Sequence, residues 1–209
     1  MSNPRRKLRW KTLSCAAISV AAFALLPAYV WVYKLSGISD APTLLLGDHV
    51  WVNRAAYAIR LPYSDRVLWN RAGPAHGDLV LVESPDNGHR VFKRVVALPG
   101  DRVGMHRHHL TINGRSLVYT VTDSAAFAAV PAENRLGSVI EIETLGAHAH
   151  LITYTPGSAT SSFPEVLVPA DHYFLMGDNR DESRDSRSWG PVPRQHLWGR
   201  VVFQPRGGH

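Results

Sequence analysis

The sequence predicts a mostly β protein, in which a sandwich-like or barrel-like domain follows an N-terminal transmembrane helix. Two observations carry this prediction. An uncharged, largely apolar run lies near the N-terminus, and many short alternating segments punctuated by Gly, Pro and Asp follow it. Three parts are therefore expected: a basic segment 1–11, an anchor 12–33 and a β-rich domain 34–209.

The predicted anchor, Thr12 to Tyr33, contains 22 residues without a charge. As a helix it spans roughly 33 Å, enough for a hydrocarbon core of about 30 Å. Five basic residues precede it, so the N-terminus is expected in the cytoplasm and the following domain outside. A cleavable secretory signal is the alternative. The length of the run and the bulky residues at its end disfavour that alternative.

The net charge of +6 is concentrated in this basic segment. Beyond it, 18 Lys and Arg nearly balance 17 Asp and Glu. This balance argues against nucleic acid as a partner, because such a surface needs basic residues spread over the fold. Cys15 is the single cysteine and lies in the apolar run, so the domain is held without an internal disulfide.

Several stretches after Lys34 have the pattern of strands, with little helical periodicity and no internal repeat. An Asn113-Gly114 pair also predicts a hairpin between residues 110 and 118. Residues 122–131 are Ala-rich and ambiguous, and residues 156–164 have the composition of a loop. The expected strands are Val50–Val52, Leu79–Val82, Arg90–Ala97, Val139–Leu145, Leu151–Tyr154, His172–Met176 and Leu197–Phe203.

Ser39 lies shortly after the apolar run, just before Pro42. The proline disfavours helix at the residue before it, so Ser39 to Ala41 is expected to be extended. A serine on such a segment could act on a peptide lying beside it as an added strand. By itself it is more simply a turn serine, and the Gly-x-Ser-x-Gly pattern of hydrolases is absent.

Lys93 is the candidate partner, because alternation places it with Val91 and Val95 on one strand face. Burial there would disfavour the ammonium form and leave a neutral amine that can act as a base. Periodicity alone favours the alternative, an edge lysine whose tip is in water.

A third stretch, Gly177 to Gly190, is dense in Asp, Arg and Ser with alternating charge. It is either a solvated loop or a loop of paired Asp and Arg that presents a serine. Arg180 stands at a ligand position of a calcium loop, which excludes that interpretation.

The three stretches together resemble the signature boxes of type I signal peptidases. These boxes are Ser39-x-x-Pro42-Thr43-Leu44-x-x-Gly47-Asp48, Lys93-Arg94-x-x-x-x-Pro99-Gly100-Asp101 and Gly177-Asp178-Asn179-Arg180-Asp181-x-Ser183-x-Asp185-Ser186-Arg187-x-Trp189-Gly190. The resemblance covers about residues 35–202. It implies a membrane-bound serine endopeptidase that removes signal peptides from exported preproteins, with the lipid bilayer as a further partner and no cofactor.

By that resemblance Ser39 is the nucleophile and Lys93 the general base, a pairing that a weakly nucleophilic hydroxyl requires. Ser183 would hold the lysine amine, and Asp178, Asp185 and Arg187 would form a supporting shell. Substrate would be bound by Leu35, Gly37, Asp40, Leu44, Val91 and Phe92.

The chain departs from the family at two positions. Asp40 stands where methionine is usual, and Gly37 where a hydroxyl residue often serves as an oxyanion donor. Backbone N–H groups could replace that donor. Neighbouring side chains of an extended segment point to opposite faces, so Asp40 should not share the face of Ser39. Because an unpaired buried carboxylate is also costly, Asp40 is expected to face solvent or lipid headgroups. The alternative is that Asp40 lines the cleft and perturbs Lys93.

Five histidines suggest a metal site, since 106/108 and 148/150 are spaced to share strand faces. The favoured interpretation is that these histidines are exposed in hairpins and bind no metal. The five histidines are His106, His108, His109, His148 and His150.

Three other functions stay open. A specialised peptidase for pilin or conjugation substrates is the nearest. A self-cleaving Ser-Lys protease would lack both the anchor and the third box. An inactive, anchored peptide-binding relative is the third, and Asp40 keeps it open.

Overall fold

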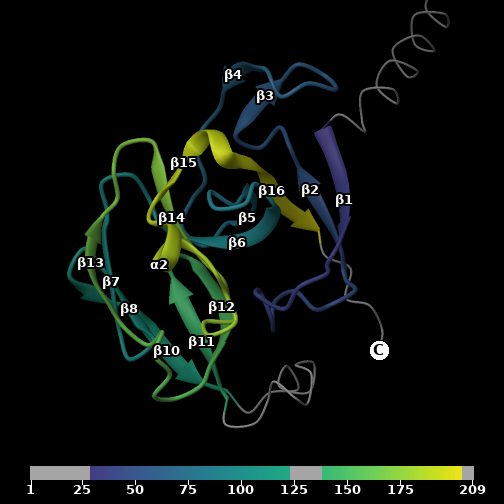
Figure 1. Cartoon of the computed structure of the whole chain (residues 1–209). Helices are drawn as coiled ribbons and strands as arrows, with labels where there is room; N and C mark the ends of the chain where they lie inside the picture. Colours follow the sequence, from purple (N-terminus) through teal and green to yellow (C-terminus); the bar gives the residue numbers. More distant parts are fainter. Residues whose placement is uncertain (1–28, 123–137, 204–209) are drawn as a thin grey trace, which may run out of the picture.

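The computed structural model describes residues 29–122 and 138–203 and is built mostly of strands, as the sequence predicts (Figure 1). Apart from Tyr29, helix within these residues is limited to α2, Ser186–Trp189, and a 3-10 turn, Arg194–His196. The strands are β1 Val30–Lys34, β2 His49–Asn53, β3 Ala58–Arg60, β4 Val67–Asn70, β5 Leu79–Glu83, β6 Arg90–Ala97, β7 Arg102–His106, β8 His109–Ile112, β9 Arg115–Ser116, β10 Val118–Val121, β11 Val139–Leu145, β12 His148–Tyr154, β13 Phe163–Leu167, β14 His172–Met176, β15 Val192–Pro193 and β16 Leu197–Phe203.

A seven-stranded sheet in the order β1-β2-β16-β5-β6-β14-β15 forms the centre of the fold. Both faces of its middle strands are covered, so β5 and the second half of β6 are buried almost without interruption. Strands buried on both faces read as continuous apolar runs, which explains Leu79 to Val82 and Val95 to Ala97. The Lys93 position of β6 is thus placed inside the protein.

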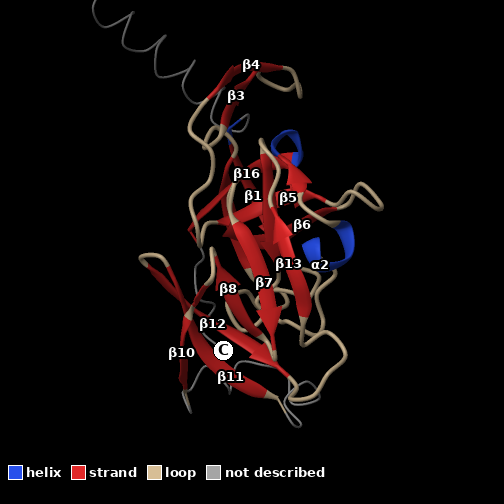
Figure 2. Ribbon diagram, turned by 90° about the vertical axis from the view of Figure 1, so that its left-hand side faces the viewer, coloured by secondary structure: helices blue, strands red, loops and turns tan. Residues whose placement is uncertain are grey.

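Three smaller sheets complete the fold. β13-β7-β8-β9 and β10-β11-β12 lie together at one end, and the β3–β4 hairpin lies at the opposite end (Figures 1 and 2). The apolar cluster around Phe174 and Met176 joins the central sheet to the first of these small sheets. The central sheet therefore carries the site, and the small sheets support it from one end.

The predicted strands are present, with β6 spanning the predicted bounds. The Asn113-Gly114 hairpin is confirmed, and both residues have positive φ, 52° and 74°, as that turn requires. The pair predicted from residues 139–145 and 151–154 is β11–β12. Of the ambiguous stretch, residues 123–131 lie outside the described part of the chain.

Seven strands were not predicted. Val30 to Tyr33, assigned to the end of the anchor, form most of β1 and pair with β2. β13 lies partly in the expected loop and contains Pro164, which its place at the edge of a sheet permits. The others are β3, β4, β7, β10 and β15. Each has at most five residues, and β7 also contains glycine, so their alternation is weak.

Most of the predicted anchor, residues 12–28, lies outside the described residues. Within residues 29–122 and 138–203, no helix is both long and apolar enough to span a bilayer.

Candidate active site

Ser39 lies in a turn rather than in the extended segment that Pro42 predicted. Backbone hydrogen bonds from Ala41 N to Ile38 O and from Leu44 N to Asp40 O close this turn. Pro42 disfavours helix at Ala41, but a turn also keeps the residue before a proline out of the helical conformation. The proline therefore did not distinguish a turn from an extended segment. Ser39 itself is partly exposed, so its hydroxyl is placed at a surface that a substrate can reach.

Lys93 brings its amine to this turn. Its Nζ donates to Ser39 Oγ at 2.7 Å and to the Phe92 carbonyl at 2.6 Å. The side chain is about 1% exposed, so the solvated-edge interpretation that periodicity favoured is wrong. The reason is topological: β6 lies between β5 and β14 in the sheet, so it is not an edge strand.

Asp40 is also buried at this point, and the expectation that it faces solvent is wrong. It is about 3% exposed, its Oδ2 accepts the Ser39 hydroxyl at 2.7 Å, and the same atom lies 3.4 Å from Lys93 Nζ. The alternation argument failed because it applies to strands, and Ser39 and Asp40 lie in a turn. Ser39, Asp40 and Lys93 thus form one hydrogen-bonded cluster.

The charge on Asp40 is costly in this environment. Burial raises the pKa of its carboxyl to about 6, although the nearby ammonium of Lys93 opposes the rise. Asp40 Oδ1 is buried and has no hydrogen-bond partner among the described residues, which adds to that cost. In this arrangement the serine proton points to the carboxylate, while the lysine donates to the serine oxygen.

Arg94, next to Lys93 on β6, links the third box to the serine turn. Its guanidinium forms two hydrogen bonds with Asp178, at 2.6 and 2.8 Å, and a third with the Gly77 carbonyl at 2.8 Å. Burial alone would raise the pKa of Asp178, but Arg94 outweighs it and lowers that pKa. The third box is therefore buried and paired at this position rather than solvated, and the arginine that pairs with Asp178 comes from β6.

Asp185 holds the other end of the third box. Its carboxylate accepts from the Gly177 N–H at 3.0 Å, from the Ser183 hydroxyl at 2.7 Å and from two nitrogens of Arg187 at 2.8 Å. The structure thus brings Ser183, Asp185 and Arg187 together, while Asp178 is held separately by Arg94. The Ser183 hydroxyl donates to Asp185, whereas the hydrogen bonds found for Lys93 go to Ser39, Asp40 and Phe92.

Gly177 is a site residue that the sequence did not single out. A Cβ at this position would collide with the Ser39 carbonyl and with the Ser183 side chain. The Asn179 N–H also donates to the Ser39 carbonyl, at 3.1 Å. The absence of a side chain at residue 177 therefore lets the third box approach the serine turn.

Gly177→Ala is expected to lower kcat/KM for peptide cleavage at least tenfold, about 1.4 kcal/mol, because the new methyl group must displace the Ser39 turn. The matched control is Gly104→Ala, whose Cβ would meet Thr111 and Glu165 far from the turn. Steady-state kinetics and a thermal melt of both variants test this. Equal losses of activity in the two would show that position 177 has no special link to Ser39.

A second buried ion pair lies beyond Asp178. Arg180 and Glu143 are both almost fully buried, and their charged groups are 2.8 Å apart. Burial would raise the pKa of Glu143, but Arg180 and His150 outweigh it and lower that pKa to about 2. His150 stands between the pairs, 3.2 Å from Glu143 and 3.8 Å from Asp178. Sequence spacing gave no signal for these contacts.

Glu143→Gln is expected to destabilise the fold by about 3–5 kcal/mol, because it leaves the Arg180 charge buried without its partner. The carboxylate has a depressed pKa, so its contribution is present above about pH 4.5 and is lost as pH falls towards 2. Denaturant unfolding at pH 7 is the measurement. Glu165→Gln, which breaks the exposed pair with Arg102, is the matched control and should cost under about 1 kcal/mol. A loss no larger than the control would contradict the account.

The structure places the predicted substrate-binding residues in different environments. Leu35, Leu44 and Phe92 belong to one buried apolar cluster beside the serine turn. Val91 packs on a different cluster, around Val80 and Val95, and is not brought together with them. Gly37 is exposed, and a Cβ there would meet open space.

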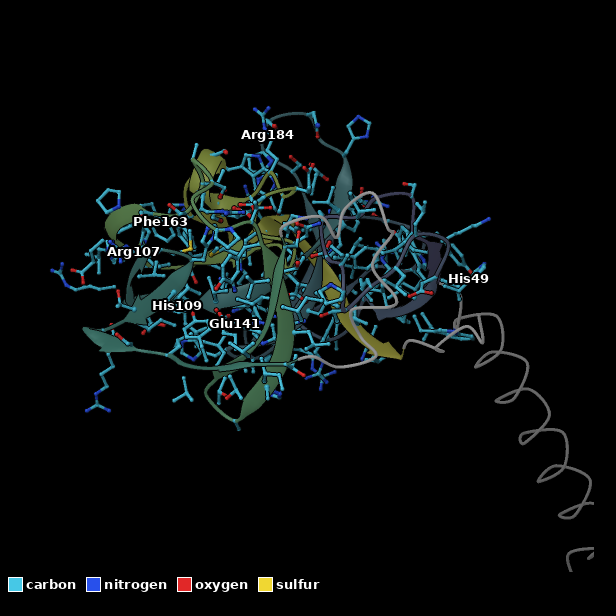
Figure 3. The ribbon with its side chains drawn as sticks, turned by 90° about the horizontal axis from the view of Figure 1, so that it is seen from below. His49, Arg107, His109, Glu141, Phe163 and Arg184 are labelled. Atoms are coloured by element: carbon cyan, nitrogen blue, oxygen red, sulfur yellow. The ribbon has the colours of Figure 1, made fainter. Side chains whose placement is uncertain are left out.

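The histidines do not lie in exposed hairpins as a set. His108 is buried in the β7–β8 turn and stacks on Tyr154, so it does not share a strand face with His106. His109 and Glu141, labelled in Figure 3, lie side by side with nitrogen and oxygen 2.9 Å apart. Among the described residues, no group of three or more His, Cys, Asp or Glu side chains could hold a metal.

Comparisons with known proteins agree with the three boxes. Residues 8–204 match the family model described as "Signal peptidase, peptidase S26". The chain is 37% identical over 184 residues to "Signal peptidase I" of Pseudomonas fluorescens and 34% identical over 183 residues to that of Pseudomonas aeruginosa. It is 27% identical over 200 residues to "Signal peptidase I" of Aquifex aeolicus. The chain belongs to the signal peptidase S26 family.

The matches span different shares of the relatives' length. The two Pseudomonas matches cover 81% of this chain but 62% of each relative, so the chain spans less than two thirds of their length. The Aquifex match covers 81% of this chain and 73% of that relative.

Proposed function

We propose that the chain is a membrane-anchored serine endopeptidase that removes signal peptides from exported preproteins. The observation that carries the proposal is the contact of Lys93 Nζ with Ser39 Oγ at 2.7 Å. A buried amine lies against a hydroxyl that a substrate can reach, which is the geometry of a nucleophile and its base. Membership of the family supplies the substrate class.

In the proposed reaction the neutral Lys93 amine takes the Ser39 proton as Oγ attacks the carbonyl carbon of the scissile bond. The C–N bond then breaks, and the lysine returns the proton to the leaving amine. Water hydrolyses the Ser39 ester with the same base, which restores the hydroxyl. Backbone N–H groups near Ser39 would bind the oxyanion in place of the side-chain donor that Gly37 lacks.

Anchoring is the second part of the proposal. The uncharged run before β1 would span the cytoplasmic membrane once, with the basic segment inside and the β-rich domain outside. β1 begins at Val30, so the spanning segment would end before it rather than at Tyr33. The Ser39 turn then follows the membrane segment by one short strand, close to where a signal peptide would emerge.

The experiment is cleavage of a preprotein by the full chain in lipid nanodiscs, with the new N-terminus identified by mass spectrometry. The expected product begins after a small residue, and a bulky residue at that position blocks its release. An intact preprotein under all conditions would contradict the proposal. Binding of the signal peptide without cleavage would instead support the alternative of an inactive peptide-binding relative. The observation that favours this alternative is the hydrogen bond from the Ser39 hydroxyl to Asp40.

A further inference from the structure

A cavity of about 560 Å³ lies between the β3–β4 hairpin and the C-terminal part of the fold. Figure 1 shows this hairpin and the 3-10 turn after β15 at the same end of the molecule. The volume is in the range of sites that hold a small organic molecule. The polar side chains that line this hairpin cavity, as we call it, are Arg60, Asn70, Asp171, His172, Arg194 and Gln195.

Arg60, at the end of β3, brings a buried positive charge to the hairpin cavity. The residue is 6% exposed, and its Nη2 donates to the Leu197 carbonyl at 3.0 Å. Its Nη1 is buried and has no hydrogen-bond partner among the described residues. A buried polar group without a partner is costly, so Arg60 has a donor left for a ligand.

No carboxylate neutralises this charge by direct contact. In the part of the chain that the structure describes, Arg60 forms no ion pair, and Asp65, the acid nearest in sequence, lies 3.8 Å from Arg54 instead. Burial lowers the pKa of the Arg60 guanidinium, and the charge of Arg90 adds to this effect, although Asp65 opposes it. A buried cation without a counter-ion is unfavourable, so a bound anion would stabilise this site.

Arg194 adds a second guanidinium to the wall of the cavity. Its Nη2 donates to the Tyr57 carbonyl at 3.0 Å and also to the Arg71 carbonyl, which ties the 3-10 turn to the hairpin. Both acceptors are neutral backbone groups, so they position this guanidinium without compensating its charge.

The remaining lining indicates the kind of anion. Asp171 is the acid of the lining, so two arginines and one aspartate leave a net charge of +1 when His172 is neutral. Val67 of β4 and Pro193 of β15 provide apolar wall on both sides. A single negative charge with an apolar body matches this lining better than a phosphate dianion. Guanidinium groups also suit the planar carboxylate group geometrically.

We propose that the hairpin cavity binds an organic carboxylate, whose charged group is held by Arg60 and Arg194 and whose apolar body lies against Val67 and Pro193. A free organic acid and the C-terminal carboxylate of a peptide share this chemistry. Ser39 and Lys93 do not line the cavity, so the proposal is independent of the proposed peptidase reaction.

The first test is calorimetric titration of the full chain in nanodiscs with phenylacetate and with phenylacetamide, using empty nanodiscs as the blank. The two probes share an aromatic body and differ in charge. Saturable binding of phenylacetate is expected, and binding of the amide should be at least about tenfold weaker. Equal affinities, or no saturable binding of phenylacetate, would overturn the proposal. This comparison needs no variant of the cavity.

Substitutions then locate the bound acid. Arg60→Met, which removes the charge but keeps an extended side chain, should weaken phenylacetate binding at least about tenfold. Arg60→Lys keeps the charge and should lose less. The matched control is Arg115→Met on the exposed strand β9, which should bind as wild type does. Undiminished binding by a folded Arg60→Met variant would place the acid elsewhere and refute the site.

Further probes separate the sources of the ligand. Acetyl-Ala-Ala-Ala with a free C-terminus is compared with its C-terminal amide in Ser39→Ala, which removes the proposed nucleophile. Peptide binding that weakens in Arg60→Met assigns the cavity to a peptide terminus, whereas peptide binding that is unaffected by Arg60→Met assigns it to a free acid. Inorganic phosphate that competes as well as phenylacetate would contradict the choice of a carboxylate.

The outcomes also separate this site from the proposed function. Wild type and Ser39→Ala are expected to bind phenylacetate equally, because the cavity does not contain Ser39. If preprotein is not cleaved while phenylacetate binds through Arg60, the peptidase proposal fails and the carboxylate site stands. If preprotein is cleaved and phenylacetate does not bind, the carboxylate site alone fails.

Discussion

Ser39→Ala and Lys93→Ala are each expected to reduce kcat/KM for a short signal-peptide substrate by at least a thousandfold, about 4 kcal/mol. Ser39 Oγ would form the new bond and Lys93 would accept its proton, so each variant removes one of the two groups that the proposed reaction needs. Because the residues act as a unit, the double variant should lose little more than either single one. Steady-state kinetics on the full chain measure this.

Matched controls are available for both substitutions. Ser116→Ala lies on the exposed strand β9, and Lys34→Ala removes an exposed lysine at the end of β1. Both should keep near-wild-type turnover of the soluble peptide. Thermal melts must show that Ser39→Ala and Lys93→Ala remain folded. A folded variant with near-normal turnover would remove that residue from the mechanism.

The second large effect is expected at Asp40. Asp40→Asn should raise kcat/KM about tenfold above about pH 6, where the wild-type Asp40 carboxyl is charged, and change it less below that pH. The charged carboxylate accepts the Ser39 hydroxyl at 2.7 Å and lies 3.4 Å from the Lys93 amine, so it competes with that amine for the serine proton. An unchanged profile would show that the Asp40 contact does not persist in the substrate complex.

The same substitution has a pH-dependent effect on stability. Burial raises the pKa of Asp40 to about 6, so the folded protein binds a proton that the unfolded chain releases near pH 4. Stability from this group is therefore full below about pH 4 and lost as pH rises through about 6. The Tm of Asp40→Asn relative to wild type should rise by about 5–10 °C between pH 4 and pH 7. A constant difference across this range would contradict a perturbed carboxyl at Asp40.

The strands that sequence reasoning predicted are those whose pattern is local. β6 carries a continuous run of strand-forming residues, and the β8–β9 hairpin has an Asn-Gly turn, so each is specified within a few residues. β1 was missed because Val30 to Tyr33 continue an apolar run, and only pairing with β2 makes them a strand. Proline in β13 argued for a loop, and the edge position that tolerates it is a tertiary property.

The same distinction between local sequence pattern and tertiary contact holds for the candidate site. The residue types of the three boxes indicate a nucleophile and a base, and their resemblance to a family places them in one site. Contacts at long sequence separation were not predictable, such as Arg94 with Asp178 and Arg180 with Glu143. Asp40 was placed wrongly because strand alternation was applied to residues that form a turn. A buried carboxylate held by Ser39 and Lys93 needs the three-dimensional arrangement to be seen.

The most direct test of the Ser39–Lys93 account is to trap the covalent intermediate. The full chain is mixed with a signal-peptide substrate, quenched in acid within the first turnover, and digested for mass spectrometry. The account predicts an ester adduct of the N-terminal part of the substrate on the peptide that contains Ser39, and no adduct in Ser39→Ala. An adduct on any other residue, or turnover by Ser39→Ala at the wild-type rate, would contradict it.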